Sequence, residues 1–269
     1  MRFGASILAV LILAGCASRT ETADGLARSG ALAYAQVQTD SFVLASYSRI
    51  GDRDQPIDVY IEGDGLAWRS RFEPSTDPTP RKAIGLALAA SDPAANVVYI
   101  ARPCQYTLAL SPRCGVAYWT GKRFAPEVIA AMNQAIDHFA GQAPGQKLNL
   151  VGYSGGGAVA VLVAARRADV ATIRTVAGNL DHKEFSRLHE VSLMPDSLNA
   201  IDVAGTVAAI PQIHFSGGDD TVVPAVIAEH FRKAAASPCV KVLVVADATH
   251  ESGWTTAWPR LLRIRPSCE

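Results

Sequence analysis

The chain has 269 residues, of which 49% are hydrophobic and 19% are charged, a composition typical of a globular protein with one sizeable core. Lysine plus arginine and aspartate plus glutamate number 25 each, so the formal net charge is zero, and like charges do not gather in runs. This balance excludes the basic surface that nucleic-acid binding requires, and we expect no nucleic-acid partner.

The N-terminus has the features of an export signal. Arg2 gives a positive start, and the apolar segment ILAVLILAG, residues 7–15, is too short to span a bilayer as a helix. The segment LAGC, residues 13–16, resembles the lipobox of bacterial lipoproteins, which implies cleavage before Cys16 and acylation of that cysteine by chains such as palmitate. A chance cysteine after an ordinary signal peptide is the alternative. The residue after this cysteine is Ala17 rather than aspartate, which resembles lipoproteins of the outer membrane that face the periplasm.

The expected domain organisation follows from these features. Residues 1–15 are predicted to be the signal peptide, and residues 16–38 the lipidated cysteine and a tether, because the segment from Thr20 to Gln38 is small, polar and alanine-rich. Residues 39–269 are predicted to form one globular domain. Within that domain, residues 179–209 are longer than a simple crossover and are a candidate small cap over the site.

Strands and helices alternate along the domain. Segments with helical periodicity cover residues 82–90, 126–139, 158–167 and 225–236. Short apolar or β-branched runs, which predict strands, are SFVLASYS, IDVYIEG, NVVYIA, KLNLVGYS, IRTVAG, PQIHFSGG and KVLVVADA. The alternation predicts an α/β fold with a mostly parallel central sheet flanked by helices. Ligands of such sheets bind beyond the carboxyl ends of the strands, so we expect the chemistry there.

The run IDVYIEG is followed by a glycine-rich turn, Glu62-Gly63-Asp64-Gly65. Glycines at such a turn let the backbone approach a substrate closely, so the N–H of Asp64 or of Gly65 is a candidate donor to an oxyanion. An ordinary Asp-Gly turn is the plainer interpretation, and the two are compatible.

Four cysteines besides Cys16 would lie in an oxidising periplasm, where an even number predicts two disulfides. The preferred pairing joins Cys104 with Cys114, across a short loop, and Cys239 with Cys268, which would hold the C-terminal tail. A zinc site is the alternative, but the sequence lacks the Cys-x-x-Cys spacing that would support it.

The run KLNLV leads into Gly152-Tyr153-Ser154-Gly155-Gly156, a match to G-x-S-x-G, and then into an apolar helix. Small residues around the serine allow a sharp turn that exposes its Oγ, and the helix N-terminus favours developing negative charge. The pattern predicts Ser154 as a nucleophile and the N–H of Gly155 as the first oxyanion donor.

An acid and a histidine follow the last two predicted strands. Asp220 has the G-x-x-D…V-P spacing of a turn common in serine hydrolases, and Asp219 is the reserve. His250 comes after KVLVVADA, where an imidazole can take the proton of the serine and later give it to the leaving group. Each residue alone has a simpler explanation, as a turn, a helix cap or a structural histidine. Their order at successive strand ends favours Ser154, Asp220 and His250 as a catalytic triad.

The sheet pattern and these motifs resemble the alpha/beta-hydrolase superfamily over roughly residues 41–262. The segments EGDGLAW, DPTP, RPCQY, GYSGGGAVA and GNLD also resemble a group of bacterial alpha/beta-hydrolase lipoproteins of unassigned substrate. This chain departs from the superfamily pattern at Glu62, where histidine often begins the oxyanion motif. The second oxyanion donor therefore stays open between Asp64 and Gly65.

Two rival functions share the same segment. GGGAVA, residues 155–160, satisfies the dinucleotide fingerprint, with Asp181 at about the distance of a ribose-binding acid. That fingerprint belongs in the first βαβ unit, whereas several strands precede it here, and an exported protein would meet little nicotinamide cofactor. A phosphate-binding P-loop is excluded because lysine does not follow the glycines. A noncatalytic binding lipoprotein on a hydrolase scaffold is the second rival.

Other residues are weaker candidates. Arg102 could pair with a substrate carboxylate, but local pairing is at least as good an interpretation. The spacing of His182 and His189 does not fit a metal site, and we expect neither metal nor organic cofactor. Trp68, Trp119 and Tyr153 are better explained by packing than by an acyl pocket.

The sequence thus predicts a membrane-anchored serine hydrolase that acts on a small-molecule or lipid ester, as a carboxylesterase or lipase-like acyl hydrolase, through an acyl-enzyme. A peptidase or an acyltransferase on the same triad is the alternative.

Overall fold

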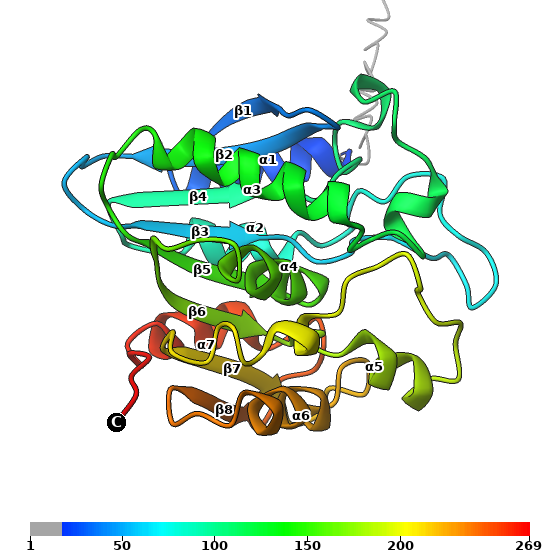
Figure 1. Cartoon of the computed structure of the whole chain (residues 1–269). Helices are drawn as coiled ribbons and strands as arrows, with labels where there is room; N and C mark the ends of the chain where they lie inside the picture. The colour runs from blue at the N-terminus through cyan, green and yellow to red at the C-terminus, as the bar shows by residue number, and fades with distance from the viewer. Residues whose placement is uncertain (1–17) are drawn as a thin grey trace, which may run out of the picture.

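The computed structural model describes residues 18–269, so the predicted signal peptide and Cys16 lie outside the described residues. One sheet crosses the molecule in the strand order β1-β2-β4-β3-β5-β6-β7-β8 (Figure 1). β2 is antiparallel to both β1 and β4, whereas β4, β3 and β5 to β8 are mutually parallel. The strands are β1 Ala33–Gln38, β2 Val43–Ile50, β3 Ile57–Ile61, β4 Asn96–Ile100, β5 Leu148–Tyr153, β6 Val170–Val176, β7 Gln212–Gly217 and β8 Val240–Val245.

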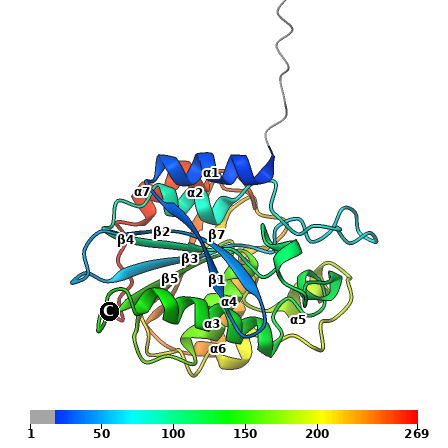
Figure 2. The same cartoon turned by 90° about the horizontal axis from the view of Figure 1, so that it is seen from above.

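Helices cover both faces of the sheet, as Figure 2 shows. α3, α4 and α6 pack on one face and bury the larger apolar cluster, while α1, α2 and α7 pack on the other face over a second cluster. The α-helices are α1 Arg19–Ser29, α2 Ile84–Ala90, α3 Pro126–Ala140, α4 Gly155–Ala164, α5 His182–Leu188, α6 Ala225–Ala235 and α7 Trp254–Leu261. Short 3₁₀ turns are η1 Leu108–Leu110, η2 Val116–Trp119 and η3 Ala200–Val203. The prediction of a mostly parallel sheet flanked by helices is confirmed.

The segment predicted as a tether is folded from residue 18 onward. Ser18 caps α1 through a capping box with Glu21, and Ala23 and Ala27 are buried on the side of α1 that faces α2. β1 then pairs with β2 along its whole length. The tether expected over residues 16–38 is therefore wrong for most of its length. The alanine content that suggested flexibility also gives high helix propensity and close packing on a neighbouring helix.

Further differences from the sequence prediction concern the ends of the elements. α4 starts at Gly155, directly after the serine, rather than at residue 158, and α5 and α7 were not predicted. The candidate cap, residues 179–209, contains α5 and η3 and lies between β6 and β7.

Two disulfides tie loops to the sheet. They join Cys104 to Cys114 and Cys239 to Cys268, the pairings that the sequence favoured. The first closes the loop after β4, and the second holds the C-terminal tail beside β8. Between residues 18 and 269, no helix combines the length and apolar character that a membrane crossing needs.

Candidate active site

Ser154 lies on a strained turn between β5 and α4. Its backbone has φ 50° and ψ −121°, a combination that non-glycine residues rarely adopt, and its N–H donates to the carbonyl of Val176 at 2.9 Å. A Cβ on Gly152 would lie 2.3 Å from the carbonyl oxygen of Gly156, and one on Gly156 would lie 2.3 Å from that of Ile61. The turn therefore requires both flanking glycines, as a nucleophile elbow does.

The structure brings Ser154, His250 and Asp220 into one hydrogen-bonded line. Ser154 Oγ lies 3.0 Å from His250 Nε2, and His250 Nδ1 lies 3.0 Å from Asp220 Oδ2. The serine follows β5, the aspartate follows β7 and the histidine follows β8, so three strands of the same sheet present the three groups at one edge. This geometry matches a nucleophile, a base within reach of its proton, and a carboxylate that orients the base.

The neighbouring residues Asp219 and Asp220 differ in burial. The Asp220 side chain is 0% exposed, and its Oδ1 accepts the backbone N–H groups of Val222 and Val223, each at 2.8 Å. Asp219 is exposed, and among residues 18–269 its carboxylate makes no hydrogen bond. Only Asp220 is thus fixed in orientation and directed at the imidazole.

Two aromatic side chains hold the backbone of His250, a feature that the sequence analysis did not anticipate. The hydroxyl of Tyr153 donates to the His250 carbonyl at 2.9 Å, and the indole Nε1 of Trp254 donates to the same oxygen at 3.1 Å. Tyr153, for which the sequence favoured a packing role, therefore links the serine turn to the histidine loop. The position of Tyr153 inside the G-x-S-x-G motif was visible in the sequence, but its partner was not.

The turn after β3 lies directly against the serine turn. A Cβ on Gly63 would come within 3.1 Å of Ser154 Cβ, and one on Gly155 would come within 2.1 Å of Asp64 Oδ1. β3 and β5 are neighbours at the point where the strand order reverses, which is where α/β sheets form their ligand crevices. Within residues 18–269, the backbone N–H groups of Gly155, Asp64 and Gly65 have no hydrogen-bond acceptor.

Glu62 anchors this turn. Its buried carboxylate accepts the N–H of Gly63 at 2.9 Å, the N–H groups of Gly85 and Leu86 at the start of α2, and the hydroxyl of Tyr99 at 3.1 Å. Burial raises the pKa of Glu62 above its ordinary value, and these hydrogen bonds act against that rise. Glu62 thus fixes the turn after β3 through these hydrogen bonds, and its carboxylate occupies the N–H of Gly63.

Two arginines form ion pairs with Asp64, in the same turn. Asp64 pairs with Arg102 at 3.1 Å and with Arg123 at 2.7 Å, and all three side chains are largely buried. Burial alone would raise the pKa of Asp64, but the two guanidinium groups lower it below its ordinary value. Of the two roles considered for Arg102, the structure shows the local one. Gln105 completes the arrangement by donating from Nε2 to the carbonyl of Gly63 at 2.9 Å.

The remaining candidates do not join the site. His182 is buried and stacks on Phe124, and burial lowers its pKa, while His189 Nε2 lies 2.7 Å from the carbonyl of Val222. In the described part of the chain, His, Cys, Asp and Glu side chains form no group that could hold a metal ion. Trp119 is buried and donates to the carbonyl of Ser75 at 3.0 Å, whereas Trp68 is 42% exposed.

Comparison with known proteins supports the fold. No protein-family model matches the chain, and no curated protein matches it in sequence. Esterase Pf2001 of Pyrococcus furiosus is similar with a TM-score of 0.61 at 14% identity, over 88% of this chain and 91% of the esterase. Est1E from Butyrivibrio proteoclasticus gives 0.59 at 12% identity, over 86% and 97% of the two chains. An alpha-beta serine hydrolase homologue from Coxiella burnetii gives 0.55 at 15% identity, over 86% and 94%. This chain therefore has the alpha/beta-hydrolase fold.

Proposed function

We propose that the protein is a lipid-anchored serine hydrolase that cleaves carboxylic esters. Ser154 is the nucleophile, His250 is the general base and then the general acid, and Asp220 orients the imidazole. The observation that carries the proposal is the hydrogen-bonded line from Ser154 Oγ to His250 Nε2 and from His250 Nδ1 to Asp220 Oδ2, with both distances 3.0 Å. Two proteins that share this fold at low identity are esterases, so an ester is the first substrate class to test.

The reaction would proceed in two stages, acylation of Ser154 and hydrolysis of the acyl-enzyme. Ser154 Oγ attacks the ester carbonyl carbon while its proton passes to His250 Nε2, and the carbonyl oxygen takes the displaced electron pair. The tetrahedral intermediate then collapses, the leaving alkoxide takes the proton from His250, and Ser154 is acylated. Water repeats the attack on the acyl-enzyme with His250 as base, which releases the carboxylic acid and returns the proton to Ser154.

The oxyanion would be bound by two backbone donors. The N–H of Gly155 follows the nucleophile directly at the start of α4, where the helix dipole also favours negative charge. For the second donor we favour Asp64 over Gly65, because Asp64 lies against Gly155. The clamp formed by Glu62, Arg102 and Arg123 would hold this turn still as charge develops on the substrate oxygen.

We place the enzyme on the periplasmic face of the bacterial outer membrane, attached through acyl chains on Cys16. The supporting observations are the lipobox-like segment LAGC and the two disulfides, which are typical of oxidising compartments.

The test uses the full chain and its Ser154→Ala variant. We expect a fluorophosphonate probe to label the wild type at Ser154, and the purified protein to hydrolyse an activated short-chain ester. The Ser154→Ala variant should lose both properties while keeping its melting temperature, because within residues 18–269 the hydroxyl makes its one hydrogen bond to His250. A folded wild type that never labels would favour the noncatalytic alternative. A peptide panel and acyl-acceptor alcohols, assayed in parallel, would reveal a peptidase or an acyltransferase.

A further inference from the structure

The folded domain begins at the edge of the sheet that carries Ser154. Arg19, the first residue of α1, donates from Nη1 to the carbonyls of Asp77 at 3.3 Å and Thr79 at 2.7 Å. Both acceptors belong to the connection that follows β3, the connection that also holds Asp64. At the other end of α1, Gly30 lies against Ala90, the last residue of α2. α1 therefore starts beside the loops of the candidate active site and runs away from them.

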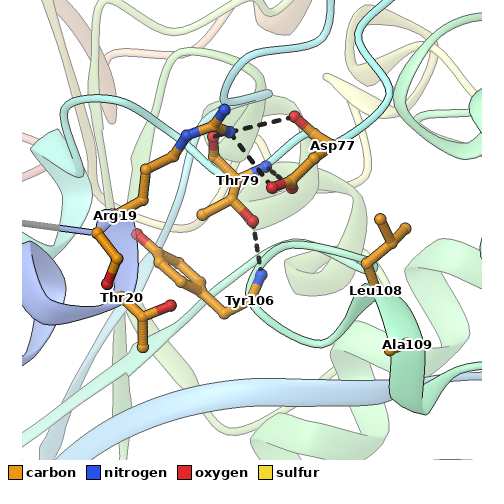
Figure 3. A pocket seen from close by; sticks show the side chains of 8 residues that line it. Arg19, Thr20, Asp77, Thr79, Tyr106, Leu108 and Ala109 are labelled. Carbon is orange, nitrogen blue, oxygen red and sulfur yellow. Dashed lines mark hydrogen bonds and ion pairs between the residues drawn. The ribbon is translucent and has the colours of Figure 1, made fainter.

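A cavity of about 400 Å³ marks this starting point (Figure 3). Its walls are the first turn of α1, Asp77 and Thr79 after β3, and Tyr106, Leu108 and Ala109 after β4. Figure 3 shows Arg19 directed at Asp77 and Thr79, and the backbone N–H of Tyr106 donates to Thr79 Oγ1 at 2.9 Å. The point at which the chain enters the domain is thus tied to two loops that follow strand ends.

Because α1 begins at Arg19 with Ser18 as its cap, the chain has almost no tether between Cys16 and the folded domain. Cys16, the residue proposed above to carry the lipid, is two residue steps from Ser18, and an extended chain covers at most about 3.5 Å per step. A lipid on Cys16 would therefore hold Ser18 within roughly 7 Å of the bilayer interface. Because Ser18 caps α1, the edge of the sheet at which α1 starts would be the edge nearest the membrane.

Most of the large hydrophobic side chains exposed on the described domain lie in connections at this same edge, after β3, β4, β6 and β7. The cyan and yellow-green loops of Figure 1 project there, beyond the strand ends. Phe72 is 86% exposed and Leu193 is 65% exposed. We define the apolar rim as these two residues with Trp68, Leu110, Val191 and Val222.

Hydrogen bonds join the segments of the apolar rim into one surface. Arg71 donates from Nη2 to the carbonyl of Glu190 at 3.0 Å, which links the loop of Phe72 to the segment of Leu193. His189 Nε2 lies 2.7 Å from the carbonyl of Val222, which adds the loop after β7. The loop after β4 is joined to the loop after β3 through Tyr106 and Thr79.

We propose that the apolar rim docks onto the phospholipid bilayer and that the substrate is an acyl ester of a membrane lipid, drawn from that bilayer. This inference rests on the lipid anchor and the serine hydrolase proposed above. Six exposed apolar side chains are unfavourable in water and would be buried among lipid headgroups and acyl chains. Arg69 and Arg71, which precede Phe72 in the same loop, would lie at the level of the lipid phosphates. The lipid on Cys16 would keep this edge of the domain next to the bilayer, so the bilayer is the surface that the apolar rim would contact.

The first experiment measures docking without catalysis. Trp68 is 42% exposed on the rim, whereas Trp119, Trp254 and Trp258 are each 5% exposed or less. Full-length lipidated protein would be reconstituted into phosphatidylcholine and phosphatidylglycerol vesicles with and without brominated acyl chains. We expect bromine to quench the exposed tryptophan, and Trp68→Phe to abolish that quenching while keeping an aromatic ring in place. Unquenched wild-type fluorescence, or equal quenching in Trp68→Phe, would overturn the docking.

The second experiment compares two esters in the same vesicles. The double variant Phe72→Asp with Leu193→Asp should hydrolyse a vesicle-embedded lipid ester at least about ten-fold more slowly than wild type, because charge replaces the inserted side chains. Its rate on a water-soluble short-chain ester should stay within about two-fold, because Phe72 and Leu193 are exposed and neither belongs to the hydrogen-bonded line of Ser154, His250 and Asp220. The matched control is Val244→Asp, a 60% exposed position on β8 outside the rim, which should change neither rate.

The outcomes separate the two proposals. A rim variant that keeps the wild-type rate on the lipid ester, or that loses both rates equally, refutes the docking and leaves the hydrolase standing. A wild type that neither labels nor hydrolyses the soluble ester refutes the hydrolase, and the bromine quenching still decides the docking. Dimers that dissociate in the rim variant would assign the surface to a second copy of the chain and would also refute the bilayer.

Discussion

Asp220→Asn is the most informative single substitution, because the structure determines how an amide must sit there. Asp220 Oδ1 accepts two backbone N–H groups at 2.8 Å, and Oδ2 faces His250 Nδ1 at 3.0 Å. The amide oxygen of asparagine will take the two N–H groups, since the amide nitrogen cannot accept them. The nitrogen then faces His250 and donates to Nδ1, so the imidazole proton moves to Nε2, the atom that must accept the proton of Ser154.

The expected loss is large. A histidine held in the wrong tautomer lowers turnover about 10⁴-fold in serine hydrolases with this arrangement. That ratio corresponds to about 5 kcal/mol of transition-state stabilisation. Stability should change little, because the buried N–H groups of Val222 and Val223 keep an acceptor. The assays are kcat on a soluble ester, the rate of fluorophosphonate labelling at Ser154, and thermal unfolding.

Asp219→Asn is the matched control. The same charge is removed one residue away, but Asp219 is exposed, so kcat should stay within about two-fold of wild type. The reasoning would be refuted by an Asp220→Asn enzyme that retains a tenth or more of wild-type kcat, or by a comparable loss in Asp219→Asn.

Three further substitutions test the site and its support. Gly156→Ala should abolish labelling of Ser154 and lower stability by several kcal/mol, as circular dichroism and denaturant unfolding would show, because its Cβ would lie 2.3 Å from the Ile61 carbonyl oxygen; a stable, active variant would contradict the turn geometry. Cys268→Ser should lower the melting temperature by releasing the C-terminal tail, whereas in dithiothreitol wild type and variant should melt together. Burial and the nearby Asp92 raise the pKa of Asp58 to about 7, so the folded state favours the protonated carboxyl. The stability from that proton is present below about pH 4 and lost as pH rises toward 7, so Asp58→Asn should gain on wild type across this window in urea titrations, and parallel pH profiles would disprove the shift.

Much of the site could be predicted from local sequence. The G-x-S-x-G pattern specifies a sharp strand-to-helix turn through steric limits alone. A Cβ at position 152 would overlap the Gly156 carbonyl, and a Cβ at position 156 would overlap the Ile61 carbonyl. Asp220 and His250 were identifiable because each follows a predicted strand, and parallel strands deliver their ends to one edge. Turn spacing favoured Asp220 over Asp219, and in the structure Asp220 is the buried residue of the two.

The clamp around the turn after β3 could not be predicted, because its parts come from separate elements. Glu62 takes partners from α2 and β4, and Asp64 takes Arg102 and Arg123 from the loops after β4. Neither pairing follows from spacing along the chain. The arginine at position 102 was noticed, but its partner depends on how two distant loops meet.

The alternation of strands and helices, and the order of serine, acid and histidine, were determined by the sequence itself, because periodicity and turn chemistry act over a few residues. Tertiary structure alone decided where the N-terminal segment goes. An alanine-rich stretch is flexible in isolation and helical when α2 offers it a surface, because packing rather than propensity supplies most helix stability. That contact removed the tether and brought the start of the fold to the same edge as Ser154.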